Sequence, residues 1–311
     1  MTPTTSPVET SSANTYDFSC LTGFFVDHVE VAKVSPGSLV ATQPGLGLLG
    51  RSYETDTSPS DSRPQWTRFA AYVKHLNQVS PPAESYKVIY LVRHGLGVHN
   101  IAMSKYGGEA WKTKWSHMDG DGEGNVWADA QLVEEGIRQA QKLSQIWFDE
   151  AKKDKVALPE SLYTSPLARC LHTTKLVFQP VMEANQREFH PIIKELLRER
   201  LTDHTCDKRS SRFWIQQNYP EYIIEPGFEE DDTLWKPHSN KPEEAEEHFA
   251  RKQRLLNDIF EHDKSQFISL TNHSYAITAI LVTVKAPKFR VCEGTIVPLF
   301  VKAVRTKEKT V

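Results

Sequence analysis

Positively charged and imidazole side chains follow three segments of the sequence that have the composition of buried strands. Arg93 and His94 come directly after the apolar run KVIYLV, and Arg169 follows the run SLYTS by a few residues. His273 follows QFISLTN, immediately before an apolar helix pattern. The planar fork of arginine matches the oxygens of a phosphate group, and helix N-termini favour anions. These residues predict a phosphate pocket with a histidine in its floor.

The elements that must position these side chains alternate between strand and helix patterns from Lys87 onward. The expected strands span residues 87–92, 160–165, 266–270 and 295–304, and the expected helices span 132–151, 166–178, 241–260 and 274–284. We expect Ser165 and Pro166 to form the N-cap and the first turn of the second helix. Alternation of this kind predicts an α/β fold with a mostly parallel central sheet and helices on both faces. Ligands of such sheets bind beyond the carboxyl ends of the strands, where the four side chains should meet.

Two further regions precede this alternating part. Residues 1–15 are rich in Ser and Thr and lack an apolar pattern, which predicts a disordered tail. Residues 16–86 form an N-terminal extension that packs on the core, and the main domain spans residues 87–311. The extension contains an apolar stripe at helical spacing, formed by Trp66, Phe69, Val73 and Leu76. We therefore expect a short amphipathic helix that packs against the main domain.

The composition excludes several classes of function. The chain has 311 residues, 25% of them charged, and a formal net charge of −3, so no nucleic-acid partner is expected. The longest apolar stretch, YAITAILVTV from Tyr275, is too short to span a bilayer, and no secretory signal is visible. The four cysteines are far apart and form no CxxC pair, which favours reduced thiols. A cytoplasmic location is therefore expected, and a nuclear location stays open.

The same residues carry a resemblance to a known family. The segment LVRHGLGVHN resembles the signature of the histidine phosphatase superfamily, the phosphoglycerate-mutase-like proteins, in which Arg-His-Gly is followed shortly by Asn. TSPLARCLHTT is similar to the second motif of this family, and LTNHSYAI to its late motif, with Asn-His-Ser where Ser-His-Gly is commoner. The resemblance extends over roughly Tyr86 to Phe300. Two other segments, YGGEAWKTKWSHMDGDGEGNVWADAQL and LLRERLTDHTCDKRS, resemble a fungal and plant branch of phosphomutase-like proteins.

The resemblance implies roles for the residues at the strand ends. His94 would attack phosphorus as a neutral imidazole and hold the phosphoryl group as phosphohistidine. Arg93, Arg169 and His273 would neutralise the oxygens of the transferred group, without a metal or a cofactor. Asn100 would orient the first loop or bind the surroundings of the nucleophile, although an ordinary turn residue is an equal alternative.

The resemblance also implies a general acid on a loop in the middle of the chain. Glu199 matches the family pattern because it directly precedes a basic residue, and it would protonate the departing alkoxide and then activate water. Glu195 competes for this role, since the two acids would share a face if this segment were helical. A structural ion pair of Glu195 with Lys194 or Arg198 is the preferred interpretation. Arg209 is a weaker candidate for contact with the substrate.

Several other features suggest chemistry that the sequence does not support. DGDGEGNVWADA, from Asp119, resembles a calcium loop, but Ala130 stands where the bidentate glutamate is needed. A Gly-rich surface loop is the better interpretation, and no metal site is expected. His99, His172 and His204 are interpreted as structural or peripheral residues.

The leading functional prediction is a phosphatase that hydrolyses a small phosphomonoester, such as a sugar phosphate or a nucleotide-like molecule, through a phosphohistidine intermediate. The alternative is a phosphomutase of the phosphoglycerate mutase type, which must keep water from the phosphohistidine. A non-catalytic binding protein on this fold is a third alternative, and the presence of both arginines and both histidines argues against it. The expected partner is a small phosphorylated metabolite, with no nucleic acid and no membrane.

Overall fold

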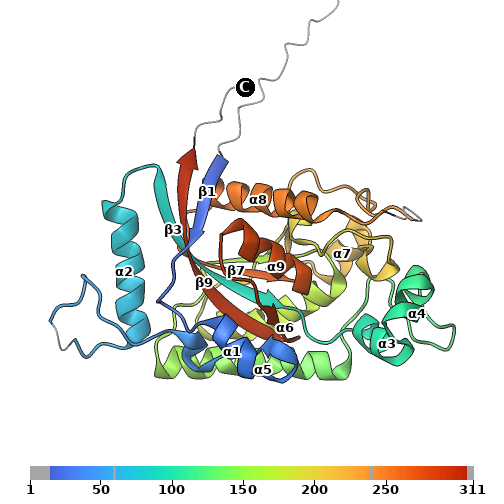
Figure 1. Cartoon of the computed structure of the whole chain (residues 1–311), viewed down its shortest axis with the longest axis horizontal. Coiled ribbons are helices and arrows are strands. Elements are labelled where there is room, and N and C mark those ends of the chain that lie inside the picture. Colours follow the sequence, from blue (N-terminus) through green and yellow to red (C-terminus); the bar gives the residue numbers. More distant parts are fainter. Residues whose placement is uncertain (1–14, 59–60, 238–240, 307–311) are drawn as a thin grey trace, which may run out of the picture.

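A computed structural model of the chain describes residues 15–58, 61–237 and 241–306. Its centre is a seven-stranded sheet in the order β1-β9-β3-β7-β4-β5-β6, and a smaller sheet pairs β2 with β8 (Figure 1). The strands are β1 Thr15–Cys20, β2 Leu39–Val40, β3 Glu84–Arg93, β4 Ser161–Thr164, β5 Ile192–Ile193, β6 Ile223–Ile224, β7 Phe267–Asn272, β8 Arg290–Val291 and β9 Thr295–Thr306. The expected tail at residues 1–15 lies outside the described residues, except for Thr15, which begins β1.

The large sheet is mostly parallel, which confirms the predicted fold class. β3, β7, β4, β5 and β6 pair in parallel, whereas β9 runs antiparallel to both of its neighbours, β1 and β3. The register places Arg93, the last residue of β3, beside Asn272 on one side and Thr295 on the other. The carboxyl ends of β3 and β7 therefore meet at one edge of the sheet.

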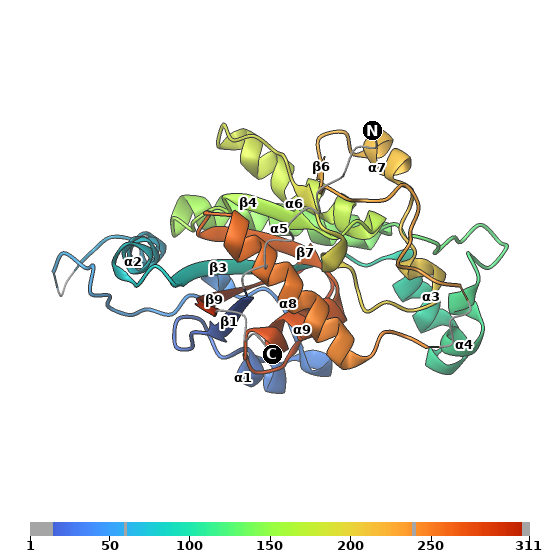
Figure 2. The same cartoon turned by 90° about the horizontal axis from the view of Figure 1, so that it is seen from above.

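Helices cover both faces of this sheet, as Figure 2 shows. The helices are α1 His28–Val34, α2 Gln65–Val79, α3 Val98–Tyr106, α4 Gly108–Thr113, α5 Glu134–Lys153, α6 Ala168–Ala184, α7 Arg212–Asn218, α8 Ala245–His262 and α9 Ser274–Thr283. The strand β3 alternates between the two cores, because successive side chains of a strand point to opposite faces. Val88, Tyr90 and Val92 join the core under α2, α5 and α6, while Ile89 and Leu91 join the core under α8 and α9. Burial on both faces explains why β3 is apolar from Val88 to Val92.

The N-terminal extension is integrated with the main sheet. β1 adds an edge strand through its pairing with β9, and α2 buries Trp66, Phe69 and Val73 in the same core as Tyr90. Leu76 is partly buried against that core, so the predicted apolar stripe faces inward. The helix α2 of the extension lies at one end of the molecule (Figure 1). The opposite end, beyond the carboxyl end of β3, is formed by α3 and α4.

The start of α6 differs from the expectation. The helix begins at Ala168 instead of Pro166, and its N-cap position is Leu167. The Ser165 hydroxyl lies 2.8 Å from Nε2 of His273 and accepts only a long bond, of 3.5 Å, from the Leu167 N–H. The carboxylate of Asp129, from a distant loop, accepts the Ala168 N–H at 2.9 Å instead. A tertiary contact has therefore replaced the local cap that the sequence favoured.

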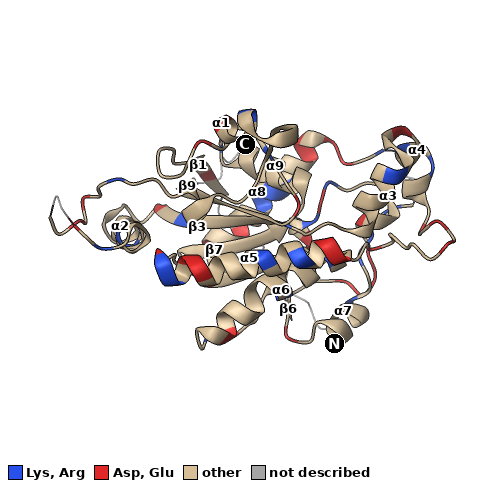
Figure 3. Ribbon diagram, turned by 90° about the horizontal axis from the view of Figure 1, so that it is seen from below, with Lys and Arg blue, Asp and Glu red and all other residues tan. Residues whose placement is uncertain are grey.

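Charges of both signs cover the outer face of α5 (Figure 3), and Arg138 pairs there with Glu134 and Glu135. This mixed surface matches the near-neutral net charge of the chain and forms no single-sign patch along the helix. Within the described ranges, no helix combines the length and the apolar character that a membrane crossing requires.

Candidate active site

A cavity of about 610 Å³ opens at the carboxyl ends of β3 and β7. Five of the residues that the sequence predicted line it together, namely Arg93, His94, Asn100, Arg169 and Glu199. They come from three separate parts of the chain, which the parallel strands and the helices that follow them bring to one place. Of the four residues that the sequence placed at a single edge of the sheet, Arg93, His94 and Arg169 share this cavity.

His94 has the geometry of a neutral nucleophile. This residue is 3% exposed, and its Nδ1 lies 2.7 Å from the Gly95 carbonyl oxygen. This contact requires Nδ1 to carry the proton, so Nε2 keeps its lone pair, and no described residue donates a hydrogen bond to it. Burial, together with the charges of Arg169 and Arg93, holds the pKa of His94 well below its usual value. The imidazole is therefore neutral at physiological pH.

The loop that carries His94 lies in direct backbone contact with the start of α5. A Cβ atom added to Gly95 would lie 2.3 Å from the carbonyl oxygen of Gly136, and one added to Gly136 would lie 2.1 Å from that of Leu96. Both glycines are therefore needed for this close approach. The Gly95 N–H also donates to Thr173 Oγ1 at 3.1 Å, which fixes the loop to α6 as well.

Each of the two arginines is held by the protein while one of its N–H groups stays unpaired. Arg93 donates from Nη1 to the Val291 carbonyl oxygen at 2.6 Å and from Nη2 to Glu293 at 2.5 Å. Arg169 donates to the Cys206 carbonyl oxygen at 2.6 Å and to Asp207 at 3.1 Å. The Nε of each arginine is buried and has no acceptor in the described part of the chain. Buried donors of this kind are rarely left unpaired, so they favour an anion at this place.

His273 lies beside His94, but it is not among the residues that line the cavity. The two rings have centroids 5.2 Å apart at an angle of 62°, and the His273 side chain is fully buried. Its Nε2 is 2.8 Å from the Ser165 hydroxyl and 3.4 Å from Cys170 Sγ. Burial and the charge of Arg169 hold its pKa well below the usual value. This position gives His273 a packing contact with the nucleophile, and its contact with phosphate oxygens stays a prediction.

The carboxylate of Glu199 lies at the N-terminus of α9. Its Oε1 accepts N–H bonds from Ala276 at 2.8 Å and Arg200 at 3.0 Å, and its Oε2 accepts one from Tyr275 at 3.1 Å. Oε2 keeps a lone pair that can carry a proton. Burial raises the pKa of Glu199, the charge of Asp207 adds to this effect, and the backbone N–H bonds oppose it. A raised pKa suits a group that must donate a proton near neutral pH.

Two basic side chains of α8 hold the loop that carries this acid. Lys252 donates to the carbonyl oxygens of Leu196 at 2.6 Å and Arg198 at 2.7 Å. Arg251 donates to the carbonyl oxygens of Arg198 at 3.0 Å and Glu199 at 2.8 Å. Both side chains are buried, so these bonds replace water as the partners of the loop carbonyls. The helix thus fixes the path of the backbone up to Glu199.

Glu195 and Arg209 bind each other and do not line the cavity. Glu195 pairs with Nε of Arg209 and, at 3.3 Å, with Arg198. Arg198 is one of the two partners that the sequence suggested, beside Lys194. The segment forms a short 3₁₀ turn over Glu195–Leu197 and not an α-helix, so the two acids share no helical face. The other donors of Arg209 bind carbonyl oxygens of Ser210, Glu229, Glu230 and Asp231. The guanidinium of Arg209 is thus engaged by the protein, and its predicted contact with the substrate stays a prediction.

Asn100 orients the loop after His94. Its Oδ1 accepts the N–H of Gly97 at 3.0 Å, across the first turn of α3. This contact fits both the loop-orienting role and the ordinary turn residue that the sequence left open.

Several other residues of the cavity were not predicted. His99 was interpreted as peripheral, but its ring centroid is 5.6 Å from that of His94, and its Nδ1 is buried without a hydrogen-bond partner among the described residues. His204 was interpreted in the same way and also lines the cavity. The remaining unpredicted lining includes Lys112, His117, Cys206, Asp207, Tyr275 and Arg290. The available signal for His99 was its position only five residues after His94, close to the end of β3.

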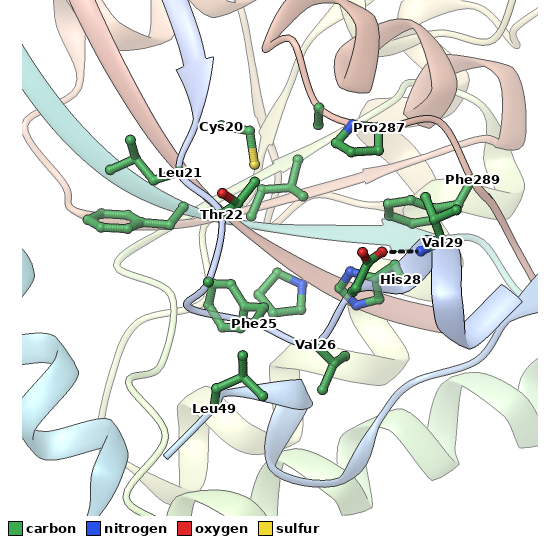
Figure 4. A pocket seen from close by; sticks show the side chains of 16 residues that line it. Cys20, Leu21, Thr22, Phe25, Val26, His28, Val29, Leu49, Pro287 and Phe289 are labelled. Atoms are coloured by element: carbon green, nitrogen blue, oxygen red, sulfur yellow. Dashed lines mark hydrogen bonds between the residues drawn. The ribbon is translucent and has the colours of Figure 1, made fainter. Parts of the chain in front are cut away.

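A second cavity, of about 330 Å³, lies between the N-terminal segment and β9 (Figure 4). Its lining is mainly apolar, with Phe25, Val26, Leu49 and Phe289 among the contributors. His28 stacks on Phe289 there, and burial lowers the pKa of this histidine to about 4. No lysine or arginine lines this cavity, so it lacks the charge that a phosphate needs.

The chain is similar to several known proteins over most of its length. A sequence model described as "Histidine phosphatase superfamily (branch 1)" matches residues 89–289, a range that includes the predicted site residues. A protein of Arthroderma benhamiae named "Probable phosphoglycerate mutase" is 40% identical over 92% of this chain and 84% of its own length. The "Phosphomutase-like protein 3" of Candida albicans is 32% identical over 72% of this chain and 68% of its own length. Among solved structures, the alpha-ribazole phosphatase from Shigella flexneri is similar with a TM-score of 0.41 and 20% identity, over 67% of this chain and 88% of that chain.

Proposed function

The chain belongs to branch 1 of the histidine phosphatase superfamily, and from this premise we propose that it hydrolyses small phosphomonoesters through a phosphohistidine at His94. The substrate would be a sugar phosphate or a nucleotide-like molecule. One observation carries the proposal. The buried, unpaired Nε groups of Arg93 and Arg169 belong to side chains that line the same cavity as His94, whose Nδ1 is engaged by the Gly95 carbonyl oxygen and whose Nε2 therefore keeps its lone pair.

The first step transfers the phosphoryl group to the enzyme. Nε2 of His94 attacks phosphorus and forms a P–N bond while the P–O bond to the leaving group breaks. The Glu199 carboxyl group gives its proton to the departing oxygen and becomes a carboxylate. The guanidinium groups of Arg93 and Arg169 stabilise the negative charge on the equatorial oxygens in the transition state.

The second step regenerates the enzyme. The Glu199 carboxylate takes a proton from a water molecule, whose oxygen attacks phosphorus as the P–N bond breaks. Inorganic phosphate leaves, and His94 returns to its neutral form. The anchoring of Glu199 on the N-terminus of α9 supports this double role, because the carboxylate is stabilised there after it has lost the proton.

A phosphomutase is the second candidate, since the relative with 40% identity carries the name of a phosphoglycerate mutase. The chemistry of the first step would be the same. A mutase passes the phosphoryl group from His94 to a second hydroxyl of the substrate, and it therefore has to exclude water. Release of free phosphate against formation of an isomer distinguishes the two reactions.

A panel of sugar phosphates, nucleotides and phosphoglycerates tests the proposal, with free phosphate and isomerised product measured in parallel. Wild-type protein should release phosphate and carry an acid-labile phosphoryl label during turnover. His94→Ala should lose both the label and the turnover. His190→Ala, a change of an exposed histidine, is the matched control and should keep both. Normal turnover in His94→Ala would end the phosphohistidine proposal.

A further inference from the structure

A turn on the wall of the catalytic cavity brings three metal-ligating side chains together. His204 precedes the 3₁₀ turn Thr205–Asp207, which contains Cys206. The ligand atoms of His204, Cys206 and Asp207 all lie within 4.8 Å of one another. The three side chains also line the cavity that contains His94. This is the one cluster of its kind within residues 15–58, 61–237 and 241–306.

Two of the three ligand groups have no other bonding partner in the described part of the chain. The Cys206 side chain is 4% exposed, and its thiol neither donates nor accepts a hydrogen bond to a described residue. The ring nitrogens of His204 likewise take part in no hydrogen bond with those residues. Asp207 is engaged, since Oδ1 accepts from Arg169 at 3.1 Å and Oδ2 from Thr202 at 2.8 Å. Each carboxylate oxygen has a further lone pair with which it can bind a cation.

The backbone of this turn is held from several sides. Arg169 donates to the Cys206 carbonyl oxygen at 2.6 Å, and the Trp235 indole donates to that of His204 at 2.9 Å. The Thr205 hydroxyl donates to the Met118 carbonyl oxygen at 2.6 Å. The three ligand groups are therefore presented by a fixed backbone, with their ligand atoms within 4.8 Å of one another.

We propose that His204, Cys206 and Asp207 form a binding site for Zn²⁺. Imidazole nitrogen, thiolate and carboxylate are the ligands that zinc takes in proteins, and three protein ligands leave one of its four tetrahedral positions open. Binding replaces the thiol proton, so each ion that binds forms a Zn–S bond and releases one proton from Cys206. The open position faces the cavity, because all three ligands belong to its lining.

This site regulates the reaction instead of supporting it. The charge of a zinc ion bound to Asp207 repels the Arg169 guanidinium, weakens the ion pair of Arg169 with this carboxylate, and thereby loosens the arginine that we assign to phosphate binding. Its open position also binds a phosphate oxygen in competition with transfer to His94. The inhibition, unlike the binding, rests on the proposed phosphatase function.

Titration with Co²⁺ and Zn²⁺ tests the binding without any assay of activity. Co²⁺ should bind at one ion per chain with thiolate-to-metal charge-transfer absorption, and Zn²⁺ should displace it with a Kd of about 1 μM or lower. Loss of an outer-shell partner already costs about 10–100-fold in metal affinity, so Cys206→Ser should weaken binding by more than about 100-fold. Cys20→Ser, a change of a half-buried free cysteine on β1, is the matched control and should bind as the wild type does. His204→Gln is a second variant whose partly exposed ring makes no hydrogen bond that folding needs.

The outcomes separate the site from its effect. Absence of Co²⁺ and Zn²⁺ binding in the micromolar range, or binding that survives both Cys206→Ser and His204→Gln, would overturn the site. If Zn²⁺ binds but leaves the phosphatase rate unchanged, the inhibitory role is wrong. If the protein shows no phosphatase activity at all, the proposed function fails, while the absorption titration still decides the metal site.

Discussion

Replacement of Glu199 by glutamine should slow catalysis in a manner that depends on the leaving group. An alkyl phosphate expels a basic alkoxide that needs a proton in the transition state, whereas p-nitrophenyl phosphate expels a stable phenolate. A positioned general acid contributes at least about 100-fold, which corresponds to about 2.7 kcal/mol of transition-state energy. We therefore expect kcat/KM for the alkyl substrate to fall by about 100-fold or more in Glu199→Gln, and that for the aryl substrate to fall much less.

The local contacts set the structural cost of this change. The glutamine oxygen can accept the N–H bonds of Ala276 and Arg200, but its NH₂ group then faces the N–H of Tyr275. One hydrogen bond is lost, which costs about 1 kcal/mol of stability. This loss acts equally on both substrates, so the ratio of the two rate losses isolates the proton transfer.

The pH profile provides a second readout. The free enzyme needs neutral His94 and protonated Glu199, so activity falls when pH drops through the pKa of His94 and when pH rises through the pKa of Glu199. Burial lowers the first pKa and raises the second, which widens the active range on both sides. Glu199→Gln should abolish the limb at high pH and keep the one at low pH. The ratio of the wild-type rate to the variant rate at each pH removes the contribution of the substrate phosphate, because its titration affects both rates equally.

Glu195→Gln is the matched control. It should lower the melting temperature, because Glu195 pairs with two buried arginines, Arg198 and Arg209, yet it should slow both substrates alike. If the dependence on the leaving group appears in Glu195→Gln and not in Glu199→Gln, the acid has been assigned to the wrong residue.

Three further changes test the framework of the site. Gly136→Ala would place a Cβ 2.1 Å from the Leu96 carbonyl oxygen, so it should displace the His94 loop and lower kcat/KM by about 100-fold. Gly108→Ala, whose Cβ would lie in open space, is the control and should leave the activity unchanged. A fully active Gly136→Ala protein would contradict the close contact. Lys252→Met should lower kcat for alkyl phosphates about 10-fold at unchanged KM, because the lysine holds the backbone that carries Glu199. The change should also raise the pKa of the limb at high pH, because the lysine charge lowers the pKa of Glu199. An unaltered pH profile would speak against this positioning role. Deletion of residues up to Pro82 should give insoluble or inactive protein, since it removes β1 and the buried side chains of α2, and a soluble, active product would disprove the predicted packing.

The sequence alone determined the residues that stand next to strand ends. Arg93 and His94 are covalently continuous with β3, and Arg169 lies one short turn beyond β4, so any parallel arrangement of these strands brings the three to one edge. The apolar stripe of α2 and the fold class were also predictable, because they depend on periodicity and on the order of elements along the chain. These properties are local, and local information was sufficient for them.

The tertiary structure decided which partner each polar group takes. The local pattern predicts Ser165 as the N-cap of α6, but its hydroxyl lies against His273, more than a hundred residues away, and Asp129 accepts the Ala168 N–H instead. The sequence suggested that Arg209 contacts the substrate, but its N–H groups donate to the carbonyl oxygens of residues 229–231. The position of Glu199 depends on α8 and α9, which the sequence places far from it. A buried polar group must find a partner, and which partner lies within reach is set by packing between distant segments, so no local pattern of residues contains the answer.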